Sequence, residues 1–582
     1  MQGVDYFVLI FYLVGMLLIG VTVMGRIKTP ADMFGAGEKS PWWASGLSSF
    51  MTMFSAGTFV VWGGVAYRLG LVAIAINLCY GIAALIAGWT VAGRWKQLGI
   101  RTPAEFVQLR FGDAALHFFT WTMIVYRMLG SAVALYALAV MLSALMPLPE
   151  GVILRDPATG NLSLVWAIIL FGGVTVLYTM LGGLWAVLLT DVLQFLVLNL
   201  SVLIIVPLLL LRFKGGFKQL DSAPEGFFHL TSGQYSWLFL AGWTTIHFFI
   251  IGAEWAFVQR FLCVPTDRDA RKSMWLFGIL YLISPWVWML PPFLYRFIDP
   301  DVPHEEAYIR SCVSVLPVGM IGLMLAAMFS ATASMISSQL NVFSGVLTED
   351  FYRPLRPSAS ESDYLFAGRC FSGLLGLVLI LLAMAVPQFG GAEKTVVAIT
   401  NLIVTPLLAP TLLGLLSSRI SSAAMWSTAV ICFTCGLVSK FASPSWLTAI
   451  QEQLGGVDTV IGVILPLVIL TGWLLCSRTT DPGWDRLHSV LKHRRETESP
   501  AIQQDASFDS VPAYLVAISI GVSGLLTGGL IWVNRSGPFS EICVLAIFSA
   551  GLCLIAICIA AMTARKTAQS YFLNQPDKAG SE

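Results

Sequence analysis

Charged residues are scarce in this chain of 582 residues. Asp, Glu, Lys and Arg together make up 12% of it, whereas about a quarter of a soluble globular protein is charged. The 34 Lys and Arg nearly balance the 33 Asp and Glu, so no net positive charge indicates a nucleic-acid partner. Hydrophobic residues make up 57% of the chain. These values exclude an ordinary soluble domain and predict an all-α integral membrane protein in a lipid bilayer.

Histidine is also rare, and the six His residues form neither an HExxH motif nor a close pair. They are His117, His229, His247, His304, His488 and His493. A membrane metalloenzyme would need such a cluster of ligands. We therefore expect a protein that is not an enzyme and has no organic cofactor.

Apolar runs of about 20 residues, the length that crosses a bilayer, recur along the whole chain. We predict about fifteen transmembrane helices, at 5–25, 44–66, 70–93, 116–146, 163–182, 188–212, 234–258, 272–297, 316–346, 363–386, 395–417, 422–441, 457–476, 511–533 and 541–563. Asp5 within the first run, and the basic residues Arg26 and Lys28 after it, are the wrong polarity for a cleaved signal peptide. We therefore expect the first run to be a true span.

Basic residues in the loops predict the orientation, because Lys and Arg collect on the cytoplasmic side. An N-terminus outside the cell places most of them inside, including Arg94, Arg110, Arg260 and Arg356. We therefore expect a multi-pass protein of the plasma membrane with its C-terminus in the cytoplasm.

The order of the apolar runs also predicts a division of the chain. The predicted parts are an N-terminal span and cytoplasmic loop (1–43), a transport core (44–418), two further spans (419–476), a polar cytoplasmic linker (477–510), and a C-terminal two-span hairpin with its tail (511–582). The linker contains an amphipathic piece near 484–493, which we expect to lie on the membrane surface.

One apolar run, Ser48 to Gly64, has small and polar residues where a plain spanning helix has Leu. Ser55, Gly57 and Thr58 lie near its middle and favour a break in the helix. Lipid cannot satisfy the backbone groups that a break releases, so a broken helix must face a cavity. Its free carbonyl groups could hold an ion.

Three ionisable residues lie inside or at the edge of apolar runs: Asp191, Arg127 and Glu254. A charge at this depth is costly unless it faces a partner or a wet cavity, so the three indicate an ion or solute path. Two structural alternatives remain open. Arg127 could pair with Glu254 or Asp191 only to hold helices together, and Asp191 could merely cap the sixth span.

The ninth span has a polar stripe at three- and four-residue steps, which places its members on one helix face. The stripe consists of Ser330, Ser334, Ser337, Ser338 and Asn341. Hydroxyl groups at this spacing are also common in ordinary helix packing in lipid. Opposite a broken helix with free carbonyls, however, they would suit a hard monovalent cation.

Several blocks in a fixed order resemble the sodium:solute symporter family, which includes the sodium/glucose cotransporters, over about residues 1–476. The blocks are PWW at 41–43, RTPAEFVQLRFG at 101–112, YTMLGGLWAVLLTDVLQF at 178–195, QRFLCVPTDRDARKS at 259–273 and LPVGMIGLMLAAMFSATASM at 316–335, followed by TEDFYRP. The pairing of GGLWAV with TDVLQ is a specific match.

The resemblance implies a leucine-transporter-like fold with an inverted repeat of five plus five helices. It places broken helices at 44–66 and 234–258, with the solute between them near the midplane. It also implies secondary active transport, in which alternating access is coupled to sodium and ion and solute favour each other's binding.

The resemblance further implies the sodium ligands. The common site would use the backbone carbonyls of Met51, Phe54 and Ala327 and the hydroxyl of Ser330. The family usually has a second hydroxyl where this chain has Ala331, unless water, Thr332 or another group replaces it. A second site would use Asp191, Ser330 and Ser334.

The solute site departs from the sugar pattern, with Gly57 and Thr58 after the break and Glu254 near the family's sugar-binding Asn. We expect five residues to face the solute: Ser55, Thr58, Asn77, Arg127 and Glu254. Arg127 could bind a carboxylate with two parallel hydrogen bonds. An acidic sugar, another organic anion or an amino acid is therefore the expected solute.

Two other function classes remain open. A proton-coupled or passive carrier is favoured by Ala331 and by Glu254, while a solute sensor with this fold would need a signalling domain for which 477–582 leaves no room. The sequence does not give the oligomeric state.

Overall fold

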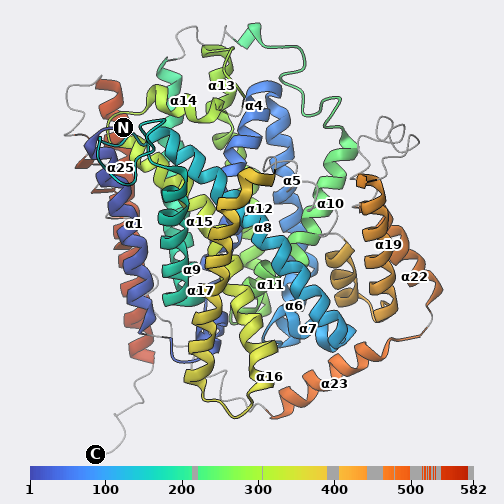
Figure 1. Cartoon of the computed structure of the whole chain (residues 1–582). Helices are drawn as coiled ribbons and strands as arrows, with labels where there is room; N and C mark the ends of the chain where they lie inside the picture. The colour runs from blue at the N-terminus through green and yellow to red at the C-terminus, as the bar shows by residue number, and fades with distance from the viewer. Residues whose placement is uncertain are drawn as a thin grey trace, which may run out of the picture.

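The computed structural model describes residues 1–25, 27–212, 220–304, 306–389, 406–441, 463–477, 479–497, 539–573 and positions 514, 517, 518, 521, 524, 525, 528, 529 and 531. These residues are almost entirely helical (Figure 1). Extended pairing in the described part is limited to two isolated bridges, Pro147 with Asn161 and Arg155 with Leu162. The predicted all-α class is confirmed.

The helices follow one another with short connections. In chain order they are α1 (Gly3–Met24), α2 (Pro30–Gly35), η1 (Ala36–Glu38), α3 (Trp42–Thr52), η2 (Thr58–Trp62), α4 (Gly63–Leu69), α5 (Leu71–Thr90), α6 (Ala92–Leu98), α7 (Pro103–Phe111), α8 (Asp113–Leu145), α9 (Leu164–Arg212), α10 (Trp237–Ala253), α11 (Trp255–Leu262), α12 (Asp267–Trp288), α13 (Leu290–Ile298), α14 (Ala307–Val315), α15 (Met320–Val346), η4 (Leu347–Tyr352), α16 (Arg353–Leu355), α17 (Glu361–Ala385), η5 (Val386–Phe389), α19 (Ser422–Phe441), α22 (Leu465–Cys476), α23 (Pro482–Thr497) and α25 (Phe539–Leu573).

Among the described residues, eight helices are long and apolar enough to cross a membrane, or up to nine if α10 and α11 form one bent span. The predicted spans at 395–417, 457–476 and 511–533 fall partly or mostly outside the described residues. The prediction of about fifteen spans therefore stays a prediction.

The helix α9 contains two of the predicted spans, and it turns back at Gly183. A straight helix of 49 residues would be about 70 Å long, more than twice the hydrocarbon thickness. Gly183 has a φ of 51° and a ψ of −149°, a backbone conformation that costs an L residue energy. Tyr178 neighbours Asp191 and Gln194 across the turn. The two halves of α9 therefore form a helical hairpin.

The first helix packs against the core rather than standing apart from it. It contacts α9 and α15, and the backbone N–H of Gly322 in α15 donates to Oδ1 of Asp5 (3.1 Å). A Cβ atom at Gly322 would lie 2.1 Å from the Asp5 carbonyl oxygen. A glycine is thus needed for the two helices to approach this closely.

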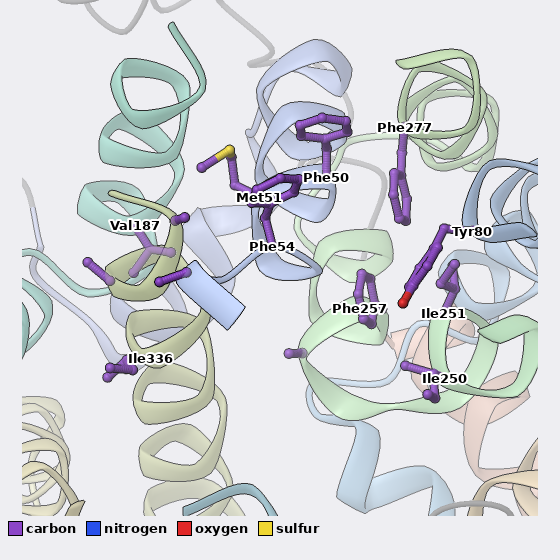
Figure 2. Packing of buried hydrophobic residues seen from close by; sticks show 14 of the residues in the cluster. Phe50, Met51, Phe54, Tyr80, Val187, Ile250, Ile251, Phe257, Phe277 and Ile336 are labelled. Atoms are coloured by element: carbon purple, nitrogen blue, oxygen red, sulfur yellow. The ribbon is translucent and has the colours of Figure 1, made fainter. Parts of the chain in front are cut away.

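The hydrophobic core surrounds α3. Figure 2 shows Phe50, Met51 and Phe54 of this helix between Val187 of α9 on one side and Phe277 of α12 on the other. The Phe50 ring lies 4.8 Å from that of Tyr281 and 5.3 Å from that of Trp288. This packing fixes the end of α3, where the chain leaves the helix.

The helix α7 lies at the same end of the molecule as α16 and α23, opposite α13 and α14 (Figure 1). Thr102 caps it as predicted, since its hydroxyl accepts from the backbone N–H of Glu105 (3.0 Å). The Glu105 carboxylate accepts from the backbone N–H of Arg101 (2.7 Å). The expected short helix is therefore present.

The predicted membrane-surface piece near 484–493 forms α23 and packs on α7. Leu487 and Leu491 are buried, so protein covers at least part of its apolar face. Arg110 of α7 is fully buried; it pairs with Asp481 and donates to the carbonyl of Ile420. Burial lowers the pKa of Arg110, and the charge of Asp481 opposes that shift. This ion pair ties the linker helix to the core.

Candidate functional site

The first predicted helix break is present. α3 ends at Thr52, Phe54 and Ser55 have no helical assignment, and η2 begins at Thr58 with π-helical geometry. Ser55 and Thr58 are half-buried, whereas Phe54 is fully buried. The small residues of this segment therefore produce the break that their low helical preference predicts.

Two threonine hydroxyl groups accept hydrogen bonds from backbone groups at this break. Oγ1 of Thr332 in α15 accepts from the backbone N–H of Ala56 (3.1 Å). Oγ1 of Thr58 accepts from the backbone N–H of Ser55 (3.4 Å). Thr332 thus links the break to α15, which places a hydroxyl group near the position where Ala331 lacks one.

The second break lies between α10 and α11, within the predicted range 234–258. The two helices are bent by 51°. Glu254 occupies the corner with an extended backbone (φ −71°, ψ 137°), and its side chain is 2% exposed. A carboxylate therefore lies at the break itself.

Glu254 forms a buried ion pair with Arg127 of α8. Nε of Arg127 lies 3.1 Å from Oε1 of Glu254, and the amide of Gln339 in α15 donates to the same oxygen (3.1 Å). Three helical segments thus converge on one carboxylate. The pairing of Arg127 with Glu254, rather than with Asp191, answers one question that the sequence left open.

The three side chains still have polar atoms to offer. Nη2 of Arg127, Oε2 of Glu254 and Oε1 of Gln339 are buried and have no hydrogen-bond partner among the described residues. A buried polar group without a partner costs roughly 1–3 kcal/mol. The site therefore presents a donor and two acceptors that a ligand could satisfy.

Aromatic side chains lie on α10 and α5 in the same region. The His247 ring lies 4.1 Å from that of Tyr80 and 4.5 Å from that of Trp243. Trp62 of η2 lies 5.8 Å from Trp243. Asn77, one helical turn before Tyr80, donates to the carbonyl of Ala73 (2.8 Å), and its Oδ1 has no partner in the described part of the chain.

A second polar cluster surrounds Asp191, which is fully buried in α9. Ser48 of α3 donates to its Oδ2, and Nη2 of Arg260 in α11 lies 3.8 Å from the same oxygen. Nε of Arg260 donates to Ser48 (3.1 Å), and Nη2 donates to Ser338 of the α15 stripe. Asp191 therefore does more than cap a helix, because it contacts both broken helices.

The predicted sodium ligands lie on α3 and α15, which are in contact. Met51, Phe54, Ala327 and Ser330 are all buried. The Ser330 hydroxyl donates to the carbonyl of Ala326 (2.6 Å) and lies 2.6 Å from the hydroxyl of Tyr12. In this structure Ser330 is thus directed to α1, while Thr332 is the hydroxyl that reaches the break.

Atoms without partners also surround Asp191. Its Oδ1, Oγ of Ser334 and both ends of the Gln194 amide are buried and have no hydrogen-bond partner among the residues described. Groups of three or more His, Cys, Asp and Glu that could hold a metal ion do not occur there. The oxygen atoms around Asp191 suit a hard cation better than a soft one.

Sequence reasoning placed Arg260 in a cytoplasmic loop, and this was wrong. The helix α11 continues to Leu262, and Arg260 is fully buried because Asp191 and two hydroxyl groups compensate for its lost hydration. Gln339 was missed, although an amide within the apolar ninth span was a visible signal.

Comparison with known proteins identifies the family. A family model described as the sodium:solute symporter family matches residues 33–430. The chain belongs to this family. Its relatives include the sodium/sialic acid symporter NanT of Aliivibrio fischeri, which is 25% identical over 519 residues, covering 85% of this chain and 97% of that protein.

Two further relatives carry sugar transport in their names or belong to a solute-carrier group. Solute carrier family 5 member 4B of Mus musculus is 25% identical, covering 76% of this chain and 72% of that protein. A sodium/glucose cotransporter of Vibrio parahaemolyticus is 25% identical, covering 72% and 82%.

A solved structure of a Na⁺-coupled sialic acid symporter, in a substrate-bound outward-open state, shares the fold. Its TM-score is 0.69 at 21% identity, covering 81% of this chain and 97% of that one. The leucine-transporter-like fold class expected from the sequence is confirmed, and the chain is a multi-pass membrane transporter of a sodium-coupled family.

Proposed function

We propose that this chain carries a small carboxylate-bearing solute across the plasma membrane together with sodium, by alternating access. The observation that supports this most directly is the buried group of Arg127, Glu254 and Gln339 beside the two helix breaks. A guanidinium group binds a carboxylate through two parallel N–H donors. Nη2 of Arg127 is available for this purpose.

Glu254 narrows the choice of solute. Its Oε2 has no partner among the described residues, so it can accept from a hydroxyl or ammonium group of the solute. Ser55, Thr58 and Asn77 supply further polar groups near the breaks. A solute with one carboxylate and several donors, such as an acidic sugar or an amino acid, fits this set better than a neutral hexose.

The sodium/sialic acid symporters among the relatives support the same choice, because sialic acid is an acidic sugar. For the ion, we propose one site at the carbonyls of Met51, Phe54 and Ala327 with the Ser330 hydroxyl. A second ion would bind Asp191 and Ser334. Sodium at either site would favour the conformation that binds the solute, and the solute would favour sodium binding to the same extent.

The test is uptake into proteoliposomes of acidic sugars and their neutral counterparts, such as glucuronate with glucose, and N-acetylneuraminate with N-acetylmannosamine. Each pair is measured with a sodium or a potassium gradient. We expect uptake of a carboxylate only with sodium. Equal uptake in both salts would contradict the proposal.

Two variants test the solute site. Arg127→Lys keeps the charge but loses the planar fork, so we expect at least a tenfold loss of carboxylate affinity. Arg127→Gln should lose more. Unchanged carboxylate uptake by Arg127→Lys would exclude the proposed role.

A proton-coupled carrier is the second candidate, because Glu254 is buried and could carry the proton. In that case a pH gradient, with no sodium present, would drive uptake, and Glu254→Gln would abolish the effect of the gradient.

For the orientation, we propose the N-terminus outside the cell and α23 in the cytoplasm, since the positive-inside rule favours it. Labelling of single cysteines introduced at exposed positions of α23 and of the 150–160 loop with an impermeant reagent on intact cells would check this. Labelling of α23 alone would contradict it.

A further inference from the structure

The cluster around Asp191 contains two polar side chains that neither proposed ion site uses, Tyr12 of α1 and Gln194 of α9. We propose that these two side chains complete a sodium site with Asp191, Ser330 and Ser334, and that α1 is therefore a part of the ion-binding machinery. This inference rests on the proposed function, because it extends the second ion site of that proposal.

Tyr12 reaches the cluster directly. Its hydroxyl lies 2.6 Å from Oγ of Ser330, and Ser330 donates its own proton to the carbonyl of Ala326. The Tyr12 hydroxyl is therefore the donor in this contact, which leaves lone pairs on both oxygens. Asp191 and Gln194 are the next polar neighbours of the Tyr12 hydroxyl.

Gln194 approaches from the helix that carries Asp191. The two residues are three positions apart on α9 and share a helix face. Gln194 is fully buried, and neither end of its amide has a hydrogen-bond partner in the described chain. A buried amide with no partner is costly, so a ligand at this position would remove a penalty that the protein otherwise bears.

The polar groups around Asp191 suit a monovalent hard cation. Oδ1 of Asp191 and Oγ of Ser334 are also without partners, while Oδ2 of Asp191 is occupied by Ser48 and Arg260. One carboxylate oxygen thus serves the protein network and the other is left for the ion. The amide oxygen of Gln194 and the hydroxyls of Tyr12, Ser330 and Ser334 add four neutral oxygen ligands, which compensates for the hydroxyl that Ala331 lacks.

A purely structural role for Tyr12 makes a different prediction. Its ring packs edge-on against that of Phe329, with centroids 6.2 Å apart. If packing were its only role, Tyr12→Phe would keep that role and leave sodium binding unchanged. The hydroxyl alone separates the two explanations.

The experiment measures the thermal stability of the purified full chain, without solute, across a series of sodium chloride concentrations balanced with choline chloride. A ligand that binds the folded state raises the apparent melting temperature with a midpoint set by its affinity. We expect Tyr12→Phe to raise the sodium concentration at half-effect at least tenfold. Gln194→Leu should do the same from the other helix.

Tyr308→Phe is the matched control, because it removes a buried tyrosine hydroxyl from α14, which carries none of the proposed ion ligands. It should keep the wild-type midpoint. A wild-type midpoint in both Tyr12→Phe and Gln194→Leu, while the wild type responds to sodium, overturns this inference and leaves the proposed function standing. A wild type that does not respond to sodium overturns both.

Discussion

Nη2 of Arg260 lies 3.8 Å from Oδ2 of Asp191, and both side chains are fully buried. Ser48 bridges the two, since it donates to Asp191 and accepts from Nε of Arg260. The carboxylate belongs to α9, the hydroxyl to the first broken helix and the guanidinium to the second. A change in the charge balance at Asp191 therefore acts on both broken helices at once.

The first prediction concerns this network. Asp191→Asn keeps the size of the side chain but leaves Arg260 buried without a carboxylate. Breaking a buried ion pair in this way costs about 3–5 kcal/mol, so the melting temperature should fall strongly. Sodium-dependent uptake should be lost as well.

The double variant Asp191→Asn with Arg260→Gln is its control. It removes both charges, so it should recover much of the lost stability and still show no sodium dependence. Sodium-dependent uptake by Asp191→Asn alone would contradict the prediction.

The second prediction concerns Gln339. In Gln339→Leu, Oε1 of Glu254 loses its amide donor and keeps only Arg127. We expect solute affinity to fall about tenfold, which corresponds to about 1.4 kcal/mol, because the position of Glu254 is less well fixed. Equilibrium binding of the transported solute measures this. Gln108→Leu on α7, far along the chain from this group, should bind as the wild type does.

The third prediction concerns the first helix break. Thr332→Val removes the acceptor of the Ala56 N–H and should cost about 1–3 kcal/mol in unfolding free energy. Thr332→Ser retains the hydroxyl and should stay within a fraction of that. Denaturation in detergent, followed by tryptophan fluorescence, compares the two. Equal stability of both variants would show that another group satisfies this N–H.

The fourth prediction concerns the linker helix. Asp481→Asn removes the charge that compensates Arg110, so α23 should detach more often from α7. Trypsin cleavage at Arg486 should become at least tenfold faster. Asp485→Asn lies four residues further on, at an exposed position of the same helix, and should be cut at the wild-type rate.

Local composition was enough to predict parts of this site. The small residues near Ser55 and Thr58 indicated a break, and the break is present. The hydroxyl stripe of α15 was predicted by spacing, and all five of its members are buried. The Arg127 and Glu254 pair was one of the alternatives that cost of burial alone allowed.

Other parts depend on contacts between distant segments, which no local pattern contains. Arg260 follows an apolar run and precedes a polar loop, so hydropathy places it outside the membrane. Only its contact with Asp191 on α9 explains why it is buried. Tyr12 and Gln339 likewise depend on which face of α15 meets α1 and which meets α11.

The turn at Gly183 has a consequence for biogenesis. No polar loop separates the two halves of α9, so the bilayer surface has nothing there to retain between one crossing and the next. Both halves must therefore leave the translocon as a single unit, after the ribosome has synthesised the second. A reporter domain inserted at Gly183 would split that unit, whereas the same domain placed after Thr159 would be carried without loss of the hairpin.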